Sequence, residues 1–365
     1  MVDVEPQIAE AAARQFSIPQ EIHSIDPHGN GHINDTFCVT ARGNGTPKRF
    51  ILQRINTHIF RAPGALMENV ERVTAHLARQ TATDPDSERK VLTLIPTREG
   101  EAWHIDSEGG CWRMYRFIEG ARTVDAVGSK EQAFEAARAF GRFQAQLADL
   151  PAPRLHETIP GFHHTPGRLD ALERAIAADT VNRAAGARAE IDFALSRKPM
   201  ARVLLDAGLP ERITHNDTKI NNVLLDDLTG EGICVIDLDT VMPGLAPYDF
   251  GDLARTALCQ AAEDERDLSK VEMEFELFEA LLRGFLDTTS EFLTRDEKRL
   301  LPFSCRLITF NIGVRFLTDH LAGDTYFKIH REGQNLDRAR TQFKLVESIE
   351  RNEEAMNRLV ESLAG

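Results

Sequence analysis

The sequence has few of the features that mark secreted and membrane proteins. It contains five cysteines among 365 residues, and none of them lies in a C-x-x-C pair. An odd number of scattered cysteines does not favour a disulfide framework, and it fits a reducing compartment. No apolar run approaches the ~18 residues that a membrane helix needs, and the acidic N-terminal stretch lacks the layout of a signal peptide. We therefore expect a cytoplasmic protein that does not act at a membrane.

Common catalytic motifs and positive charge are scarce as well. The chain has no H-E-x-x-H, G-x-S-x-G or G-x-x-x-x-G-K-[ST] motif, and we predict no zinc site. Its 43 basic and 57 acidic residues give a formal net charge of −14. Such a surface repels nucleic acids and anionic lipids at long range, so neither is an expected partner. An anionic ligand would need local positive charge or a metal ion at its site. The sequence does not fix an oligomeric state.

The order of local patterns predicts two lobes. Short strand-like runs and turns occupy the chain up to about residue 118, and helical patterns dominate after Gly120. The chain is long enough to bury a large core in two or three packing units. We therefore predict an α+β fold in which a small antiparallel β-sheet lobe (1–118) joins a larger, mostly helical lobe (119–365). The expected strands of the small lobe span residues 22–28, 36–40, 50–55 and 112–118, and its helix carries Leu66, Val70, Val73 and Leu77 on one face.

Two local patterns organise the second lobe. The patterns S-x-x-Q and T-x-x-E predict helix N-termini at Ser129 and Thr294, with the second helical stretch running towards residue 321. Between them, strand-like runs at 223–225 and 233–236 flank a turn and predict a β-hairpin.

The stretch before this hairpin carries the most informative motif. His215, Asp217 and Asn222 have the spacing H-x-D-x-x-x-x-N, which is typical of a kinase catalytic loop. Phosphoryl transfer needs a carboxylate beside the attacking hydroxyl and oxygen ligands for the Mg²⁺ that neutralises the phosphates. We predict Asp217 as the catalytic base and Asn222 as a metal ligand. Lys219 is either a contact to the γ-phosphate or a surface lysine.

A second metal ligand is expected at the end of the hairpin. Asp237 follows a buried strand, 15 residues after Asn222, and we predict that it binds Mg²⁺. Asp239 points to the same side of an extended chain and is a candidate for a further contact. The sequence Asp249-Phe250-Gly251 spells the kinase motif D-F-G, but no strand is expected to lead into it. We predict that Asp249 and Asp252 instead brace a loop or cap a helix.

The small lobe should hold the nucleotide. A glycine-containing turn at residues 28–34 lets backbone N–H groups approach phosphates closely. The third strand lacks the lysine that usually contacts these phosphates, so either Gln53 or Arg54 takes its place, with Glu68 or Glu71 as a candidate partner. The candidate nucleotide-binding residues are Gly29, Gly31 and Asn34 in the turn, Gln53 on the strand, and Arg116 and Ile118 at the join between the lobes.

Arg315 and Tyr326 are the remaining candidates. Arg315 lies in an apolar helical run, so it must be paired or face a cavity. A structural ion pair and substrate binding are equally open for it, while core packing is the usual fate of a tyrosine such as Tyr326.

Taken together, these residues resemble the aminoglycoside phosphotransferase and choline kinase superfamily, and within it the N-acetylhexosamine 1-kinases. The likeness runs nearly from end to end of the chain. Its most specific segments are Gly31-His32-Ile33-Asn34, Asn56-Thr57-His58-Ile59-Phe60, the 214–225 loop, Val235 to Gly244, Asp249 to Asp252 and Arg315 to Phe327.

The resemblance implies a bilobal protein-kinase-like fold that uses ATP and Mg²⁺. It implies phosphorylation of the anomeric 1-hydroxyl of N-acetylglucosamine or N-acetylgalactosamine, without fixing which sugar is preferred. An aminoglycoside, a choline-like amine or another alcohol is the alternative acceptor, and a non-catalytic binding module is a third possibility. By matching position, Asp217 is the base, Asn222 and Asp237 bind the metal, and His32, Asp217, Arg315 and Tyr326 contact the sugar.

Overall fold

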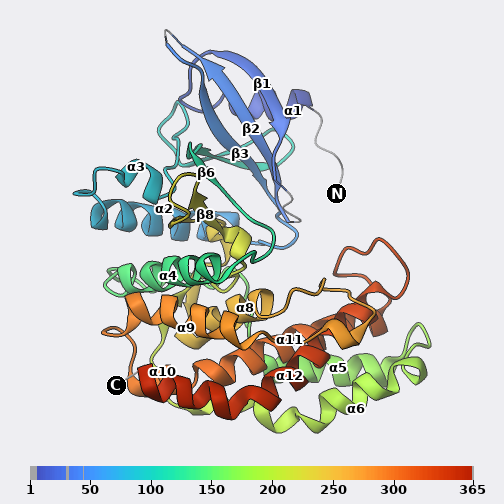
Figure 1. Cartoon of the computed structure of the whole chain (residues 1–365). Coiled ribbons are helices and arrows are strands. Elements are labelled where there is room, and N and C mark those ends of the chain that lie inside the picture. Colours follow the sequence, from blue (N-terminus) through green and yellow to red (C-terminus); the bar gives the residue numbers. More distant parts are fainter. Residues whose placement is uncertain (1–5, 30–32, 44, 364–365) are drawn as a thin grey trace.

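The chain forms the two predicted lobes, joined near residue 118 (Figure 1). The computed structural model describes residues 6–29, 33–43 and 45–363. A twisted antiparallel sheet forms the small lobe, and a layered set of helices forms the large lobe (Figure 1). This arrangement confirms the α+β, protein-kinase-like fold. The domain boundary at residues 118 and 119 stays a prediction.

The small-lobe sheet contains five strands in the order β1-β2-β3-β5-β4. All neighbouring strands are antiparallel, and β1 and β2 form the hairpin predicted around residues 28–34. The strands agree with the sequence prediction to within a few residues, and β4 is an addition to it. Their bounds are β1 Glu21–Pro27, β2 Asp35–Arg42, β3 Lys48–Ile55, β4 Trp103–Ile105 and β5 Cys111–Arg116.

The two faces of this sheet have different roles because successive side chains of a strand point to opposite sides. One face packs under α1 (Pro6–Ala13) and carries buried side chains such as Leu52 and Trp112. On the other face, Gln53 of β3 is paired across the sheet with Thr36 of β2 and with Arg113 of β5. A polar row therefore crosses three strands on the face away from the small-lobe core.

Helix α2 (Pro63–Gln80) links the small lobe to the large one. Its apolar stripe includes all four residues predicted from the spacing, Leu66, Val70, Val73 and Leu77, and each of them is buried. Asn69 on this helix donates hydrogen bonds from Nδ2 to the carbonyls of His156 (2.8 Å) and Val241 (3.2 Å) in the large lobe. The helix is thus bound to the large lobe by both packing and buried polar contacts.

The large lobe is built mainly from long helices. In Figure 1, α4 and α9 run side by side beneath the small lobe, and α11 and α12 lie below them. The helices other than α1 and α2 are α3 Ser87–Lys90, α4 Lys130–Gln146, α5 Thr165–Ala178, α6 Arg188–Ser196, α7 Val203–Asp206, α8 Ala246–Ala257, α9 Phe275–Thr289, α10 Arg295–Arg299, α11 Leu301–Ala322 and α12 Gln334–Leu363, and the short 3₁₀ turns are η1 Ala185–Ala187, η2 Lys198–Arg202, η3 Ile220–Asn222, η4 Leu238–Thr240 and η5 Leu268–Lys270.

The predicted helix starts are largely correct. Ser129 accepts a hydrogen bond from the backbone N–H of Gln132, although the Gln132 side chain returns its bond to the N–H of Gly128. Thr294 and Glu297 form the complete reciprocal box. The helical stretch after Thr294 is not continuous, since α10 ends at Arg299 and α11 begins with Leu301.

Two small sheets frame the centre of the large lobe. The predicted hairpin is present as β8 (Val223–Asp226) and β9 (Gly232–Val235), and β6 (Ala121–Arg122) pairs with β8. In addition, β7 (Arg212–Thr214) pairs with β10 (Met242–Gly244). The expectation that no strand precedes the D-F-G sequence is therefore wrong, since β10 ends shortly before helix α8.

Gly251 of that sequence has a packing role. A Cβ atom added at this position would lie 2.5 Å from the carbonyl oxygen of Ser304 and 2.8 Å from Cγ1 of Ile308. Only glycine lets α8 approach α11 this closely. The D-F-G sequence is thus part of a helix crossing.

Candidate active site

The predicted catalytic loop lies between β7 and β8, and His215 fixes its start. The His215 ring packs against the rings of Phe140 (5.4 Å) and Phe143 (5.8 Å) of α4. Its Nε2 lies 2.9 Å from the carbonyl of Ile236, and its Nδ1 accepts a hydrogen bond from the N–H of Asp217 (3.3 Å). Because a carbonyl only accepts, Nε2 carries the proton and the imidazole is neutral. His215 thus joins the loop to the chain leading to Asp237.

Two aspartates of α8 hold the backbone of this loop. The Asp249 carboxylate accepts the N–H groups of His215 (2.9 Å) and Asn216 (2.7 Å) and also bonds Nε2 of Gln144 (2.6 Å). Burial raises the pKa of Asp249, and these donors oppose that effect. Asp252 accepts the N–H of Thr218 at 3.0 Å. Both aspartates brace the loop as predicted, but they lie inside α8 and not at its N-cap position, which Leu245 occupies.

The Asp217 carboxylate is held at the centre of the loop. Lys219 places Nζ 2.9 Å from Oδ1 of Asp217, and Asn222 donates from Nδ2 to the Asp217 carbonyl at 2.8 Å. Burial acts to raise the pKa of Asp217, but the charge and hydrogen bond of Lys219 outweigh it and the pKa lies below its usual value. Asp217 is therefore ionised at neutral pH and can orient or deprotonate a hydroxyl.

Asn222 and Asp237 lie beside this carboxylate. The carbonyl of Asn222 accepts the N–H of Ile236 (2.9 Å), so the two predicted metal ligands come from paired segments. The amide nitrogen of Asn222 is committed to Asp217, and its amide oxygen has no hydrogen-bond donor among the described residues. That oxygen and the Asp237 carboxylate are hard donors of the kind that Mg²⁺ prefers.

The electrostatics of Asp237 also fit a bound cation. Asp237 is accessible to solvent and adopts a left-handed backbone (φ 61°) just after β9. The protein around its carboxylate limits hydration, and together with the negative charges of Asp239 and Asp217 this raises the pKa of Asp237 to about 6. A divalent cation would relieve this repulsion between carboxylates.

Arg113 is a site residue that the sequence argument missed. Its guanidinium is buried on β5 and forms an ion pair with Asp239, whose side chain is also buried. The second oxygen of Asp239 accepts a hydrogen bond from Nδ2 of Asn34 at 2.6 Å. Asp239, predicted as a further metal contact, is thus engaged by two small-lobe side chains. An arginine within the apolar strand Cys111–Arg116 was the available signal, because a buried charge needs a partner.

The question left open on the third strand has a structural answer. Gln53 accepts a hydrogen bond from Nε of Arg113 at 3.0 Å, on the face towards the large lobe. Arg54 points to the other face, where its guanidinium lies over the Trp112 ring. The proposed partner Glu68 instead contacts His156, with Oε2 2.9 Å from Nε2.

The remaining nucleotide candidates are distributed along the same side of the small lobe. Gly29 has a positive φ of 75°, so the predicted turn uses glycine where a side chain would be strained. Gly31 and His32 lie outside the described residues. Arg116 pairs with Glu88 (2.7 Å). Ile118 is buried, and its backbone N–H has no acceptor among the described residues.

Arg315 and Tyr326 come together on the acceptor side of the catalytic loop. The Arg315 guanidinium lies among three rings, those of Phe162 (5.4 Å), Tyr326 (5.7 Å) and Phe327 (5.3 Å). Nη2 of Arg315 lies 3.5 Å from the Tyr326 hydroxyl. Tyr326 is 61% exposed, so the expectation of core packing is wrong.

No carboxylate pairs with Arg315 in the described part of the chain, so the expected structural ion pair is absent. A second guanidinium, that of Arg168, donates to the carbonyl of Phe162 at 2.9 Å. Burial and the nearby Arg315 lower the pKa of Arg168 to about 10. This corner of the molecule is thus positively charged and lined by aromatic rings.

His163 connects this corner to the catalytic loop. Its Nε2 lies 2.9 Å from the carbonyl of Asn216, and its pKa is lowered to about 4 by burial, while Asp217 and Arg315 both act on it at close range. The cationic corner therefore lies near the loop that carries Asp217.

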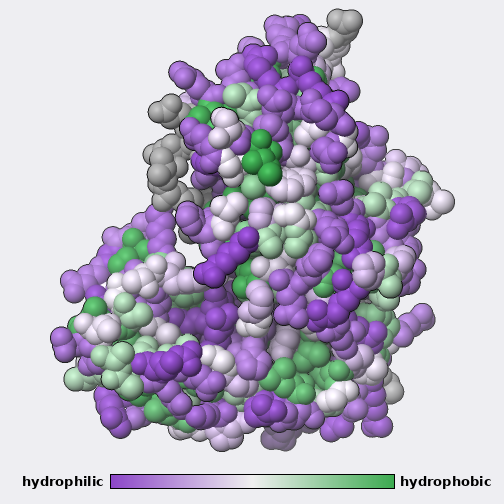
Figure 2. Space-filling view, turned by 180° about the vertical axis from the view of Figure 1, so that it is seen from behind, coloured by the Kyte–Doolittle hydropathy of each residue, from purple (hydrophilic) through white to green (hydrophobic). Residues whose placement is uncertain are grey.

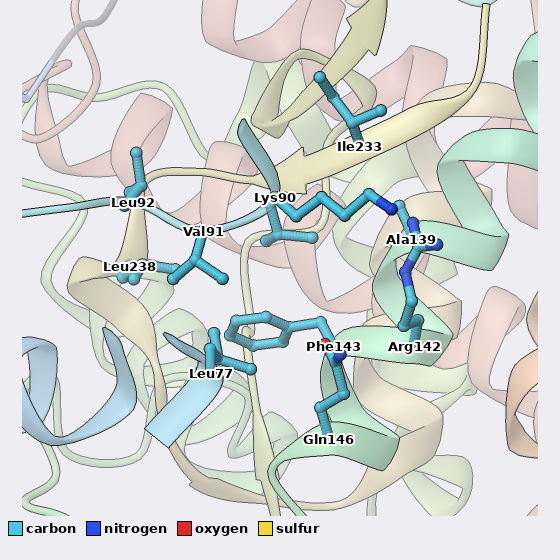
Figure 3. Close-up of a pocket in the computed structure, with 11 residues that line it drawn as sticks. Leu77, Lys90, Val91, Leu92, Ala139, Arg142, Phe143, Gln146, Ile233 and Leu238 are labelled. Carbon is cyan, nitrogen blue, oxygen red and sulfur yellow. The ribbon is translucent and has the colours of Figure 1, made fainter. Parts of the chain in front are cut away.

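Two pockets adjoin these elements. One, with a volume of about 260 Å³, lies beside β10 and the segment 159–164. The other, shown in Figure 3, has a volume of only about 20 Å³ and lies between α2, α4 and β9, lined by side chains such as Leu77, Phe143 and Leu238. It has room for about one water molecule. A wider recess separates the lobes at the left edge of the space-filling view in Figure 2.

Comparison with known proteins identifies the fold and the site together. A model of the phosphotransferase enzyme family matches residues 24–282, which include the catalytic loop, the hairpin and the braces of α8. The chain belongs to this family. The phosphotransferase is also similar in fold to solved structures that share little sequence with it.

Three such structures illustrate the range. A microcompartment-associated aminopropanol kinase is 17% identical, with a TM-score of 0.58 over 96% of this chain and 98% of its own. An aminoglycoside phosphotransferase from Alicyclobacillus acidocaldarius is 13% identical, with a TM-score of 0.61 over 97% and 96%. The AMP-bound complex of a spectinomycin phosphotransferase is 12% identical, with a TM-score of 0.51 over 91% and 97%. The chain is thus a small-molecule phosphotransferase. None of its described helices is long and apolar enough to span a bilayer.

Proposed function

We propose that this phosphotransferase is an ATP- and Mg²⁺-dependent kinase that phosphorylates the anomeric 1-hydroxyl of an N-acetylhexosamine, either N-acetylglucosamine or N-acetylgalactosamine. Asp217 is its catalytic base. The nucleotide occupies the side of the small lobe that carries Gly29, Gln53 and Ile118. His32 of the resemblance remains a proposed sugar contact.

The observation that carries the choice of acceptor is the charge around Arg315. Arg315 and Arg168 face the acceptor side without a carboxylate partner among the described residues. Two guanidinium groups repel an ammonium-bearing acceptor, and they donate hydrogen bonds to carbonyl and hydroxyl oxygens. An N-acetylated sugar offers both oxygens and no positive charge. The exposed Tyr326 ring supplies a flat surface for the sugar.

The chain's own residues suffice to prepare the acceptor. The ionised Asp217 accepts a hydrogen bond from the 1-hydroxyl and takes its proton as the bond to phosphorus forms. Lys219, 2.9 Å from Asp217, neutralises part of the charge near the transferring group. Asn222 and Asp237 would hold Mg²⁺, which when bound neutralises phosphate charge. Asp249 and Asp252 keep the loop backbone fixed during these events.

An amine-bearing alcohol is the second candidate because relatives in fold are named as an aminopropanol kinase and an aminoglycoside phosphotransferase. A panel of N-acetylhexosamines, hexosamines with a free amine, choline-like alcohols and aminoglycosides separates the two, with ADP release as the readout. We expect turnover with N-acetylhexosamines and little with cationic acceptors. Activity on the amines but not on the neutral sugars would overturn the proposal.

A further inference from the structure

The most unusual polar contact in the molecule is a buried ion pair that joins the two lobes. Arg113 on β5 is 1% exposed, and its partner Asp239 on η4 is 2% exposed. The guanidinium is also oriented from within the sheet, because its Nε donates to Oε1 of Gln53 at 3.0 Å. Gln53 in turn donates from Nε2 to the hydroxyl of Thr36 at 3.2 Å. The pair is thus fixed by a row of side chains across β5, β3 and β2.

Asp239 is held from the other side by the turn that follows β1. Asn34 donates from Nδ2 to Asp239 at 2.6 Å, and its own Oδ1 accepts the N–H of Asn56 at 3.0 Å. The Asp239 carbonyl accepts the hydroxyl of Thr158 at 2.7 Å. Both the side chain and the backbone of Asp239 are therefore fixed.

Such a contact is a poor way to gain stability. Removing two charges from water costs several kcal/mol per ion, and well-packed apolar residues of similar volume often serve as well or better. The orientation that the pair imposes is therefore its most useful property. Asp239 stands two residues after Asp237, and the two are connected through the single 3₁₀ turn of η4. Fixing Asp239 fixes the backbone that presents the Asp237 carboxylate.

We propose that Arg113 is a positioning residue for the metal–nucleotide site. Acting through Asp239, it holds Asp237 in place for the metal and ties the Asn34 end of the β1–β2 turn to the same point. It supplies from β5 the fixed positive charge that β3 lacks, since β3 carries Gln53 at the inward position. This inference rests on the proposed role of Asp237 as a metal ligand, and it does not depend on the identity of the acceptor.

The test measures binding of Mg²⁺ and the non-hydrolysable ATP analogue AMP-PNP by calorimetry, without any acceptor. The variants are Arg113→Met, Arg113→Lys and Gln53→Ala, which remove the charge, keep it in a different shape, or remove the hydrogen bond that orients it. Arg197→Met is the matched control, because it removes a two-bonded ion pair with Glu350 (2.8 and 3.0 Å) between α6 and α12, remote from the site. Thermal unfolding is recorded for each protein.

We expect Arg113→Met to weaken Mg²⁺-dependent AMP-PNP binding by about 10- to 100-fold, as is typical when a residue supporting a metal ligand is lost. Arg113→Lys should recover part of this loss, Gln53→Ala should show a smaller loss in the same direction, and binding of AMP-PNP in EDTA should change little. Arg197→Met should alter only the unfolding temperature.

Wild-type Mg²⁺ dependence in a folded Arg113→Met protein would overturn the inference. If that variant does not fold, wild-type Mg²⁺ dependence in both Arg113→Lys and Gln53→Ala would overturn it equally. Because no acceptor is present, failure to phosphorylate sugars leaves this result standing. Failure of the wild-type protein to bind Mg²⁺ with AMP-PNP would instead overturn the proposed kinase function.

Discussion

The ammonium of Lys219 lies 2.9 Å from Oδ1 of Asp217, two residues earlier in the same loop. This contact keeps the carboxylate charged in a surrounding that would otherwise favour its protonated form. The hydrogen bonds to Asp249 and Asp252 set where the loop runs, and Lys219 sets the charge state of its central residue. The chemistry of the site depends on both.

Asp217→Asn should remove nearly all turnover while leaving the protein folded. The amide keeps the size and part of the hydrogen bonding of the carboxylate, but it cannot accept the hydroxyl proton, so we expect kcat to fall by about 10²- to 10⁴-fold. ADP release in the presence of N-acetylglucosamine measures the change. AMP-PNP affinity should remain within a few fold of wild type, and retention of substantial turnover would remove Asp217 from the catalytic role.

Arg315→Ala should weaken binding of the acceptor. Loss of hydrogen bonds from a charged donor costs about 1.5–3 kcal/mol, which corresponds to an increase in the KM for the sugar of about 10- to 100-fold. The KM for ATP should change little. Arg306→Met, on the same helix, removes an ion pair with Glu353 (2.8 Å) and serves as the control. An unchanged sugar KM in Arg315→Ala would separate this arginine from the acceptor.

His163 should make the protein sensitive to mild acid. The folded state binds a proton at His163 only near pH 4, whereas an unfolded chain binds it near pH 6.5. The unfolded state therefore carries more protons in this window, and stability falls as the pH drops from 6.5 towards 4, by about 3 kcal/mol at most. His163→Gln, which keeps a donor for the Asn216 carbonyl, should flatten this part of the curve.

Urea unfolding between pH 4 and 7 measures the effect. His23→Gln, at an exposed position of β1, is the control and should keep the acid sensitivity of the wild type. A His163→Gln protein that loses as much stability as the wild type over this range would contradict the assignment.

Gly251→Ala should destabilise the large lobe although alanine is the better helix former. The added methyl group would lie 2.5 Å from the Ser304 carbonyl, so α8 and α11 would have to separate. Overpacking of this kind costs about 1–3 kcal/mol. Gly186→Ala, where a methyl group meets no atom within 4 Å, is the matched control. Equal unfolding temperatures for the two variants would show that the crossing tolerates a side chain.

The sequence predicted best the features that depend on neighbours along the chain. The spacing of His215, Asp217 and Asn222, and the hairpin that ends at Asp237, are local, so motif and periodicity locate them correctly. The predicted strands of the small lobe and the face of α2 follow from alternation and helical spacing for the same reason. The assignment of roles to these residues remains to be tested.

What the sequence did not predict depends on contacts between distant segments. Arg113 and Asp239 are 126 positions apart, and no local pattern links them. The exposure of Tyr326 and the lack of a carboxylate near Arg315 arise from the packing of α11 against the segments at residues 162 and 327. The direction of Gln53 and Arg54 could have followed from strand alternation, but only once the inward face of β3 was known.

Phosphorus NMR of the product tests the central claim most directly. With ATP, Mg²⁺ and N-acetylglucosamine or N-acetylgalactosamine, the account predicts a single new phosphomonoester whose phosphorus couples to the anomeric proton, and its loss in Asp217→Asn. A phosphorus coupled to the C6 protons, or no phosphorylated sugar while an amine-bearing alcohol is converted, would contradict it.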